Sequence, residues 1–461
     1  MSTYYVENFG CRATQADGNA IERQFLDRGL SRAENAVNAG VVVLNTCTVT
    51  ASADQDVRNS IRRIHRENPG CKIVVTGCYA QRAPQELAAI SGVSLVVGNS
   101  HKHQIGEVAC GSSPSFVPLG SLGVNPPLAN SFEAEHNSAV EVLVGDIFAH
   151  TTLMAAPVFD AGSERTRPNL KVQDGCNNRC SFCIIPSVRG RSRSLRPSDV
   201  VGEVDALVAA GYREVVISGI NLGRWGRDLG EASKFSALVR RVLEETSLEK
   251  LRISSVEPMD WTDELIELCA GNSRIAKHAH VPMQSGSDRV LRLMHRKYRP
   301  WHYEEKIKKI RAAMPTAAIG ADVMVGFPGE TDADFEETRA MIERLPMTYL
   351  HVFTFSARPG TPAATLPGEV RPQVMKERNR VLRELAANKK REFQQGFVGR
   401  TLEAITLTNF DGERTECLTD NFQKLWVEGK WESNQWLQVE IAGIGADALT
   451  GACEVRASAA D

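Results

Sequence analysis

The stretch LKVQDGCNNRCSFC, residues 170–183, places three cysteines in one short loop directly after an apolar strand. Cys176, Cys180 and Cys183 follow one another at spacings of four and three residues. Thiolates are the soft ligands that iron–sulfur clusters require. Three thiolates leave one iron of a four-iron cluster open, so that a second molecule can chelate it. The loop therefore predicts a [4Fe–4S] cluster with one open iron.

A zinc site and a group of unrelated buried thiols are the two alternatives for this loop. Zinc would need a fourth cysteine or histidine, and its cysteine pairs are commonly spaced C-x2-C. No histidine lies near the loop, since His150 comes well before it. The iron–sulfur interpretation is therefore favoured.

Strands and helices alternate after this loop. Apolar runs predict six strands, at residues 170–173, 214–218, 250–254, 277–281, 319–324 and 349–355. Helices are predicted at residues 197–210, 234–245, 261–270, 303–314, 332–344 and 371–396. Such alternation gives a parallel sheet covered by helices, and six units are two short of a closed eight-unit barrel. The cysteine loop lies at the C-terminal end of the first strand, where barrel enzymes assemble their active sites.

The first hundred residues also alternate, with strands predicted at 3–6, 41–44, 73–76 and 94–97 and helices at 18–30, 54–66 and 84–90. Cys11, Cys47 and Cys78 each follow a strand. The carboxyl ends of parallel strands meet at one edge of a sheet, so this pattern predicts a second site with three thiols. Cysteine is also a common core residue. The remaining thiols fit that alternative: Cys71, Cys110, Cys269, Cys417 and Cys453.

The rest of the chain divides by composition. Residues 112–161 are rich in Ser, Pro, Gly and Asn and are predicted to be a linker with one strand at 140–144. Short strands at 402–406, 416–418, 424–427 and 437–441 predict a small antiparallel barrel. The expected fold is therefore α/β, with a parallel N-terminal domain (1–111), the linker (112–161), a partial (β/α)6 barrel (162–396) and the small β-barrel (397–461).

The 461 residues carry a net charge of −2, which gives no general attraction to nucleic acid. Neither a signal peptide nor a membrane span is predicted, so we expect a cytoplasmic protein. Eleven cysteines in such a protein favour metal ligands or buried thiols over disulfides.

The C-x3-C-x2-C loop, with Phe182 before its third cysteine, resembles the signature of radical S-adenosylmethionine (SAM) enzymes. Nearly the whole chain resembles the methylthiotransferases, which have an N-terminal cluster domain, a radical SAM core and a C-terminal TRAM domain. The segments VLNTCTVT (43–50) and VTGCYAQ (75–81) match their N-terminal signature. The chain departs from the pattern at Thr14, where relatives usually carry Asn. This departure puts a polar contact near the second cluster in doubt, but not the ligand Cys11.

The resemblance implies two [4Fe–4S] clusters, one on Cys176, Cys180 and Cys183 and the other on Cys11, Cys47 and Cys78. It also implies that SAM binds the open iron of the first cluster and is cleaved on reduction to a radical. A second SAM would donate a methyl group to sulfur on the other cluster. The implied SAM contacts are Phe182, Ser218, Gly219, Asn221, Ser255, Glu257, Gln284 and Gly326.

The segments RISSVEP (252–258) and HVFTFS (351–356) resemble the branch that acts on N6-threonylcarbamoyladenosine at position 37 of tRNA. The expected reaction adds a methylthio group to C2 of that adenine. The implied partners are a tRNA anticodon stem-loop and an electron donor such as flavodoxin or ferredoxin. Other substrates of the class are isopentenyladenosine in tRNA and an aspartate of a ribosomal protein. A hypothesis from another class is a non-catalytic RNA-binding protein with a structural metal.

Contact with RNA would require local basic clusters. Three clusters are candidates for phosphate contacts: Arg58, Arg62, Arg63 and Arg66; Arg189, Arg191, Arg193 and Arg196; and Arg296, Lys297 and Arg299. Residues 399–461 are acidic, with five Lys or Arg against eleven Asp or Glu. This module would therefore contact RNA through stacked aromatics such as Phe422 and Trp426, or it would pack on the core.

Overall fold

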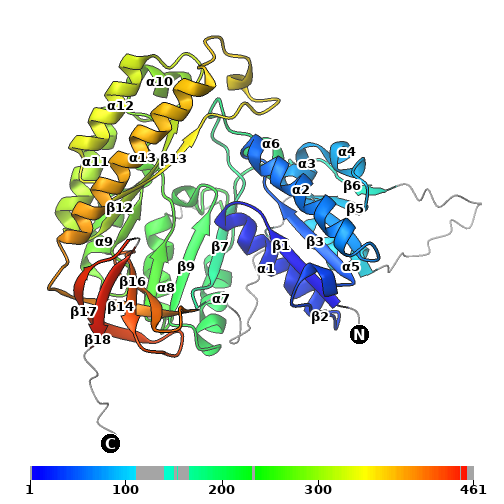
Figure 1. Ribbon diagram of the computed structural model, residues 1–461, viewed down its shortest axis with the longest axis horizontal. Helices are drawn as coiled ribbons and strands as arrows, with labels where there is room; N and C mark the ends of the chain where they lie inside the picture. The colour runs from blue at the N-terminus through cyan, green and yellow to red at the C-terminus, as the bar shows by residue number, and fades with distance from the viewer. Residues whose placement is uncertain are drawn as a thin grey trace, which may run out of the picture. The chain divides into compact units, whose positions relative to one another are not determined.

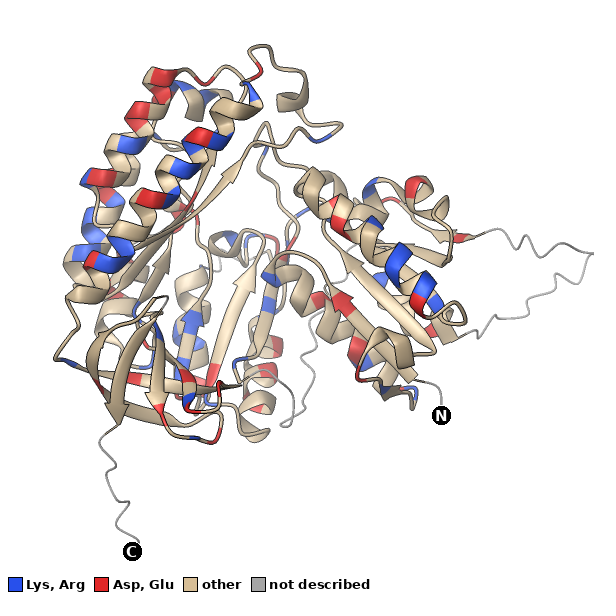
Figure 2. Cartoon of the chain, viewed as in Figure 1, with Lys and Arg blue, Asp and Glu red and all other residues tan. Residues whose placement is uncertain are grey.

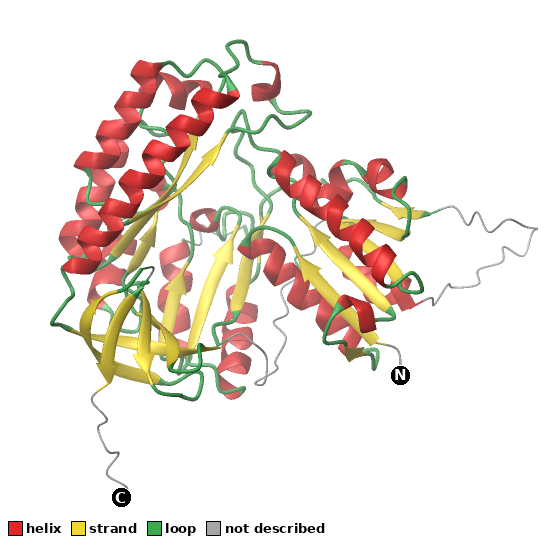
Figure 3. Ribbon diagram, viewed as in Figure 1, coloured by secondary structure: helices red, strands yellow, loops and turns green. Residues whose placement is uncertain are grey.

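A computed structural model describes residues 3–110, 140–149, 153, 166–230, 234–446 and 448–453. The chain forms two compact units, Met1–Thr48 with Ser52–His150 and Val49–Ala51 with Thr151–Asp461. Helices cover parallel sheets in both units, and a small β-barrel ends the chain (Figures 1 and 3). None of the helices in the described ranges has the length and apolar character that a membrane span needs.

The N-terminal unit is a parallel sheet with strand order β2-β1-β3-β4-β5-β6. β-branched runs build its centre, and Val42, Val43 and Leu44 are fully buried. Its strands are β1 (Thr3–Asn8), β2 (Ser31–Arg32), β3 (Val41–Thr46), β4 (Lys72–Gly77), β5 (Val93–Gly98) and β6 (Glu141–Leu143). Its helices are α1 (Arg12–Leu26), η1 (Ala36–Asn38), α2 (Ala51–Glu67), α3 (Cys78–Arg82), α4 (Pro84–Ala88), η2 (Lys102–Gln104) and α5 (Ile105–Cys110).

This unit differs from the sequence prediction in several places, among them the short elements β2, α3 and α5, which the sequence does not predict. Helix α1 begins at Arg12 rather than at residue 18. Gly18 therefore lies inside the helix instead of at its start. A glycine is needed there, because a Cβ at this position would lie 2.0 Å from Asn8 Oδ1. Strand β6 confirms the strand predicted at 140–144, but it pairs in parallel with β5 of the N-terminal sheet instead of belonging to a linker. The N-terminal unit thus extends beyond residue 111.

The second unit contains the expected six parallel strands. β7 (Asn169–Asp174), β9 (Glu214–Gly219) and β10 (Lys250–Ile253) form one sheet, and a short antiparallel strand, β8 (Arg193–Ser194), adds to its β7 edge. β11 (His278–His280), β12 (Ala318–Val325) and β13 (Tyr349–Thr354) form the other sheet. Parallel bridges from Leu251 to Ile275 and from Ser255 to His280 join the two sheets into one curved, open barrel wall.

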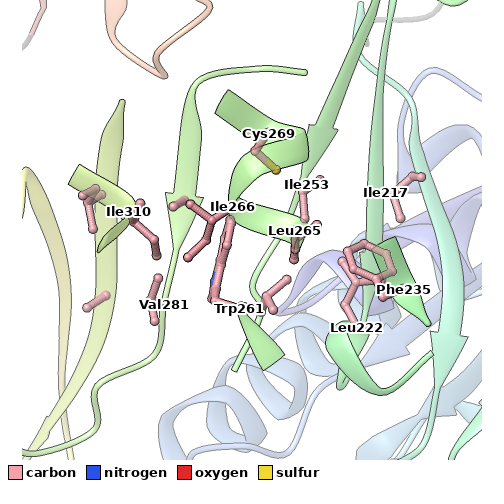
Figure 4. Close-up of a cluster of buried hydrophobic side chains, with 14 of the residues drawn as sticks. Ile217, Leu222, Phe235, Ile253, Trp261, Leu265, Ile266, Cys269, Val281 and Ile310 are labelled. Atoms are coloured by element: carbon pink, nitrogen blue, oxygen red, sulfur yellow. The ribbon is translucent and has the colours of Figure 1, made fainter. Parts of the chain in front are cut away.

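Helices cover the outside of this wall and bury a continuous apolar core, part of which is drawn in Figure 4. Trp261 and Phe235 are buried there, and so is the Cys269 thiol, as expected for a core cysteine. The α-helices are α6 (Ile185–Arg189), α7 (Pro197–Ala209), α8 (Phe235–Glu245), α9 (Asp263–Gly271), α10 (Asp288–Leu293), α11 (Pro300–Ala313), α12 (Asp332–Arg344) and α13 (Pro372–Gln395). Three 3-10 turns also occur, η3 (Leu222–Arg224), η4 (Pro258–Asp260) and η5 (Pro362–Thr365).

The C-terminal module is a closed barrel with strand order β14-β15-β16-β18-β17. Its strands are β14 (Thr401–Phe410), β15 (Arg414–Thr419), β16 (Lys424–Glu428), β17 (Trp436–Ile444) and β18 (Leu449–Cys453). The sequence predicts four of them and misses β18. The barrel is also not wholly antiparallel, because β16 and β18 pair in parallel to close it. Cys417 is buried in its core.

Candidate active site

The loop that carries Cys176, Cys180 and Cys183, here called the loop site, begins where β7 ends. Gly175 has a φ of +68°, and a Cβ at this position would lie 2.0 Å from the carbonyl oxygen of Arg191. Only glycine can make this turn without moving the backbone. The Cys176 amide then donates to the carbonyl oxygen of Gly190 at 3.1 Å. The backbone after α6 therefore holds the first cysteine in place.

A buried ion network lies directly under the loop site. Asp174 accepts hydrogen bonds from the Gly175 amide (2.8 Å), Arg189 (3.0 Å), Lys171 (3.0 Å) and Arg193 (3.1 Å). Burial alone would raise the pKa of Asp174, but the three cations outweigh this effect and hold the pKa well below its usual value. Asp174 was not among the residues predicted from the sequence. The prediction that Arg189 and Arg193 contact phosphate is wrong, because both are buried against this carboxylate.

The three thiols of the loop site lie in one electrostatic environment. Burial raises the pKa of Cys176, and it raises that of Cys183 to about 12. The charge of Cys180 adds to both increases. The three cysteines are half-buried, and as thiolates they would need a local positive charge, which bound iron would supply.

Polar groups from other elements reach the sulfur atoms. The Asn178 amide donates to Cys176 Sγ at 3.4 Å, and Asn221 Nδ2 donates to the same sulfur at 3.6 Å. Arg296 donates to Cys180 Sγ at 3.3 Å and forms an ion pair with Glu257. Arg296 is thus a buried partner of the loop site and not the phosphate contact that its sequence cluster predicts. Burial raises the pKa of Glu257, although Arg296 opposes this effect.

Three of the predicted SAM contacts present buried polar atoms that lack a hydrogen-bond partner within the described part of the chain. These atoms are Ser218 Oγ, Asn221 Oδ1 and Gln284 Oε1. An unmet buried polar atom costs about 1–3 kcal/mol, so three of them indicate a site made for a polar ligand. The residues present therefore fit a bound SAM, and Asn221 also connects this group to Cys176.

The other predicted SAM contacts have protein neighbours. Phe182 packs against the apolar core, and a Cβ on Gly219 would lie 2.9 Å from Gln173 Oε1. Ser255 Oγ lies 3.0 Å from His280 Nδ1. The Gly326 amide donates to Glu330 at 2.7 Å. The Gly326 amide is therefore already used within the fold.

A polar cavity of about 270 Å³ opens beside the loop site. Arg224, Arg227 and Lys297 give it positive charge, and Asp228 gives it negative charge. Its other lining residues are Asn177, Asn178, Ser192 and Asn221. The loop site is thus next to a space that suits a polar, partly anionic ligand.

Cys11, Cys47 and Cys78, here called the strand-end site, come from three separate βα turns. Their strands β1, β3 and β4 are adjacent and parallel, so all three turns lie at one sheet edge. A Cβ on Gly10 would lie 2.8 Å from Cys47 Sγ, which places the residue before Cys11 directly against that sulfur. Cys11 is exposed, whereas Cys47 and Cys78 are buried.

Polar side chains also reach this site. Cys11 Sγ and Thr14 Oγ1 lie 3.6 Å apart, and Asn99 Nδ2 donates to Cys78 Sγ at 3.7 Å. The hydroxyl of Thr14, at the position where relatives usually carry Asn, thus lies beside the Cys11 sulfur.

Comparison with known proteins agrees with this geometry. Residues 170–342 match the radical SAM superfamily, and residues 3–98 match the uncharacterized protein family UPF0004. The threonylcarbamoyladenosine tRNA methylthiotransferase MtaB of Aquifex aeolicus is 36% identical over 94% of this chain and 99% of its own length. The chain belongs to the radical SAM tRNA methylthiotransferases.

Other relatives in this family carry two different names. The MtaB of Bacillus subtilis is 36% identical over 93% of this chain and 91% of its own. A tRNA-2-methylthio-N(6)-dimethylallyladenosine synthase of Thermobifida fusca is 34% identical over 87% of this chain and 77% of its own. Among solved structures, the radical SAM methyltransferase TsrM of Kitasatospora setae has a TM-score of 0.52 and 17% identity, covering 78% of this chain and 75% of its own, which shows a shared fold.

In this methylthiotransferase the C-terminal barrel packs on the starts of the barrel strands. The loop between β15 and β16 carries Phe422, whose ring centroid lies 4.4 Å from that of His278 and 5.6 Å from that of Tyr349. Arg252 donates to the carbonyl oxygens of Thr419 and Asp420 at 3.3 and 3.0 Å. The half-buried Phe422 ring therefore packs on the barrel core, which is the second of the two roles that the sequence suggested for this module.

Two groups of predicted phosphate contacts remain exposed on the methylthiotransferase: Arg191, Arg196 and Lys297 around the loop site, and the basic residues of helix α2. Arg62, Arg63 and Arg66 are exposed there, while Arg58 donates to Tyr79 Oη at 2.7 Å. Figure 2 marks several basic positions along α2, and many acidic and basic positions along α12 and α13. Exposed pairs such as Arg339–Glu336 and Arg380–Glu384 lie on these last two helices.

Proposed function

We propose that this methylthiotransferase adds a methylthio group to C2 of N6-threonylcarbamoyladenosine at position 37 of tRNA. The observation that carries the proposal is the likeness to the Aquifex aeolicus MtaB, which extends over 99% of that relative. The match to the Thermobifida fusca dimethylallyladenosine synthase covers 77% of that relative, so about a quarter of its length does not align with this chain.

The two three-thiol sites support a proposal of two [4Fe–4S] clusters. We assign one to Cys176, Cys180 and Cys183, which lie in one short loop fixed by the Gly175 turn and by hydrogen bonds from Asn221 and Arg296 to its sulfur atoms. We assign the other to Cys11, Cys47 and Cys78, which adjacent parallel strands bring to one sheet edge. Each set offers three ligands and leaves one iron open for exogenous chemistry.

An unactivated aromatic C–H bond offers neither an acidic proton nor a leaving group, so one-electron chemistry from cluster-bound SAM is the suitable means of activating it. The protein has to hold SAM at the loop site. Ser218, Asn221 and Gln284 suit this role through their unmet polar atoms. Arg296 keeps a positive charge at Cys180 and holds the Glu257 carboxylate beside it. The electron comes from an external donor of the flavodoxin or ferredoxin type.

The test is an anaerobic assay of the reconstituted enzyme on two anticodon stem-loops that differ only in the modification of adenosine 37. One carries the threonylcarbamoyl group and the other the dimethylallyl group. We expect mass spectrometry of the digested RNA to detect a methylthio product from the first stem-loop alone. A product from the dimethylallyl stem-loop alone, or from a ribosomal protein and no RNA, would reject the proposed substrate.

A further inference from the structure

Three ligand-type side chains meet on the strands of the second sheet, and none of them is a cysteine. His280 ends β11, Asp322 lies in the middle of β12, and His351 lies opposite Asp322 on β13. Their ligand atoms all lie within 4.8 Å of one another. Among the described residues, this is the one group of three or more His, Cys, Asp or Glu side chains that close together.

The strand register explains why these side chains share one face. Successive residues of a strand point to opposite sides of the sheet. Ala321 and Val323, on either side of Asp322, are fully buried in the helix-covered core. Asp322 therefore points to the other face, and so does His351, its register partner. The His280 and His351 ring centroids lie 5.6 Å apart.

His280 is oriented in the way that metal-binding histidines usually are. Its Nδ1 lies 3.0 Å from Ser255 Oγ. If Nδ1 donates its hydrogen to that hydroxyl, the lone pair of Nε2 is directed towards Asp322. Nε2 is buried and lacks a hydrogen-bond partner, although Asp322 Oδ1 lies 3.4 Å away. His280 as a whole is only 9% exposed. The alternative is a simple ion pair between His280 and Asp322. Such a pair would direct the Nε2–H of His280 at the carboxylate, and it would not explain why His351 also lies close to both.

We propose that His280, Asp322 and His351 bind one divalent first-row transition metal ion. Two imidazoles and one carboxylate form a nitrogen and oxygen ligand set that suits zinc, iron or manganese and differs from the thiolates of the cluster sites. Exposure increases from buried His280 through half-buried Asp322 to exposed His351, so the remaining coordination positions face the His351 side. The inference does not depend on which substrate the enzyme modifies.

The probe is zinc alone, added to the anaerobically reconstituted full-length enzyme. Equilibrium dialysis with elemental analysis should find one zinc ion per chain beyond the iron, with iron and sulfide contents unchanged. X-ray absorption at the zinc edge should show nitrogen and oxygen ligands at about 2.0–2.1 Å. A sulfur shell at about 2.3 Å would place the zinc on cluster thiols and overturn the proposal.

Single substitutions assign the ligands. His351→Ala is the main variant, because this exposed side chain can be removed with little risk to folding, and it should weaken zinc binding more than about tenfold. Ser255→Ala should weaken it by about tenfold to a hundredfold if Ser255 orients His280. His278→Ala is the matched control, since His278 lies two residues earlier on the same strand and outside the group. Equal zinc binding by wild type and His351→Ala would overturn the proposal.

Discussion

The loop site and the strand-end site each offer three thiols, but they are built in different ways. The loop site fits within eight residues of sequence, and its geometry depends on one glycine turn and the ion network around Asp174. The strand-end site draws its cysteines from residues 11, 47 and 78, and the hydrogen bonds between β1, β3 and β4 bring them together. The same set of ligands can therefore be specified by local spacing or by topology.

The largest expected difference between the two sites concerns their chemistry. Replacing all three loop-site cysteines with Ala should remove about four of about eight irons and abolish reductive cleavage of SAM. Replacing all three strand-end cysteines should remove the other four irons, keep SAM cleavage and abolish methylthio transfer. Iron and sulfide analysis with product assays measures both outcomes. If neither triple variant lost iron relative to wild type, the assignment of ligands would be wrong.

The second prediction concerns the charge under the loop site. Asp174→Asn leaves three buried cations without their carboxylate and should lower the free energy of unfolding by about 3–5 kcal/mol. The control is Asp199→Asn, which weakens the exposed pair with Arg196 and a hydrogen bond from Ser198 and should cost at most about 1 kcal/mol. Denaturant unfolding of both variants measures the difference. Similar losses in the two would show that the buried network contributes little.

The third prediction concerns a buried ion pair in the N-terminal unit, which contains the strand-end site. Lys102 Nζ lies 2.9 Å from Asp17 and 3.2 Å from Asn45 Oδ1, and all three residues are buried. Lys102→Met should destabilise this unit by about 3–5 kcal/mol, because the buried Asp17 carboxylate loses its pairing with this ammonium group. Hydrogen exchange of β1 and β3 measures the effect. Arg23→Met, which removes an exposed partner of Asp27, should leave their exchange rates unchanged.

A glycine substitution tests how closely the strand-end turns must pack. A Cβ on Gly10 would lie 2.5 Å from Cys47 Cβ, at a φ of +101°. Gly10→Ala should therefore displace Cys47 and reduce the iron content by up to about four per chain, while the loop-site cluster remains. Gly29→Ala is the matched control, since Gly29 also has a positive φ (+75°) but faces open space. Full iron content in Gly10→Ala would show that the turn can relax.

The last prediction concerns the pH dependence of cluster loading at the loop site. Burial raises the pKa of Cys176, and it raises that of Cys183 to about 12, so both thiols are protonated near neutral pH. Because iron binds thiolates, loading has to release these protons. The apparent iron affinity should rise with pH from 7 to 9, by up to about tenfold per pH unit for each thiol. Iron titration of the variant without strand-end cysteines measures it, and a flat profile would contradict it.

Sequence patterns were sufficient for features that are local. The six parallel strands of the barrel and the helix at residues 332–344 follow from alternating apolar runs. The loop site follows from cysteine spacing within one turn. The strand-end cysteines could be grouped from the sequence because each follows a predicted strand, and the ends of adjacent parallel strands meet at one sheet edge.

Features that depend on distant contacts were missed. Asp174 gains its role from cations up to nineteen residues away, and the pairing of Lys102 with Asp17 spans 85 residues. Strand β18 was missed because it is completed by a parallel pair with β16. The sequence suggests Phe422 as a base-stacking residue, because nothing in the adjacent sequence reveals that it packs on His278 and Tyr349.

The packing of the β15–β16 loop on the barrel limits how this protein can be recombined. Phe422 lies against the starts of β11 and β13, and Arg252 and Lys250 reach the carbonyl and carboxylate groups of the C-terminal module. Part of the module's acidic character therefore complements basic groups of its own chain. A chimera that joins a homologous module to this core therefore has to keep Phe422 and the acidic residue Asp420, because both contact residues of the core.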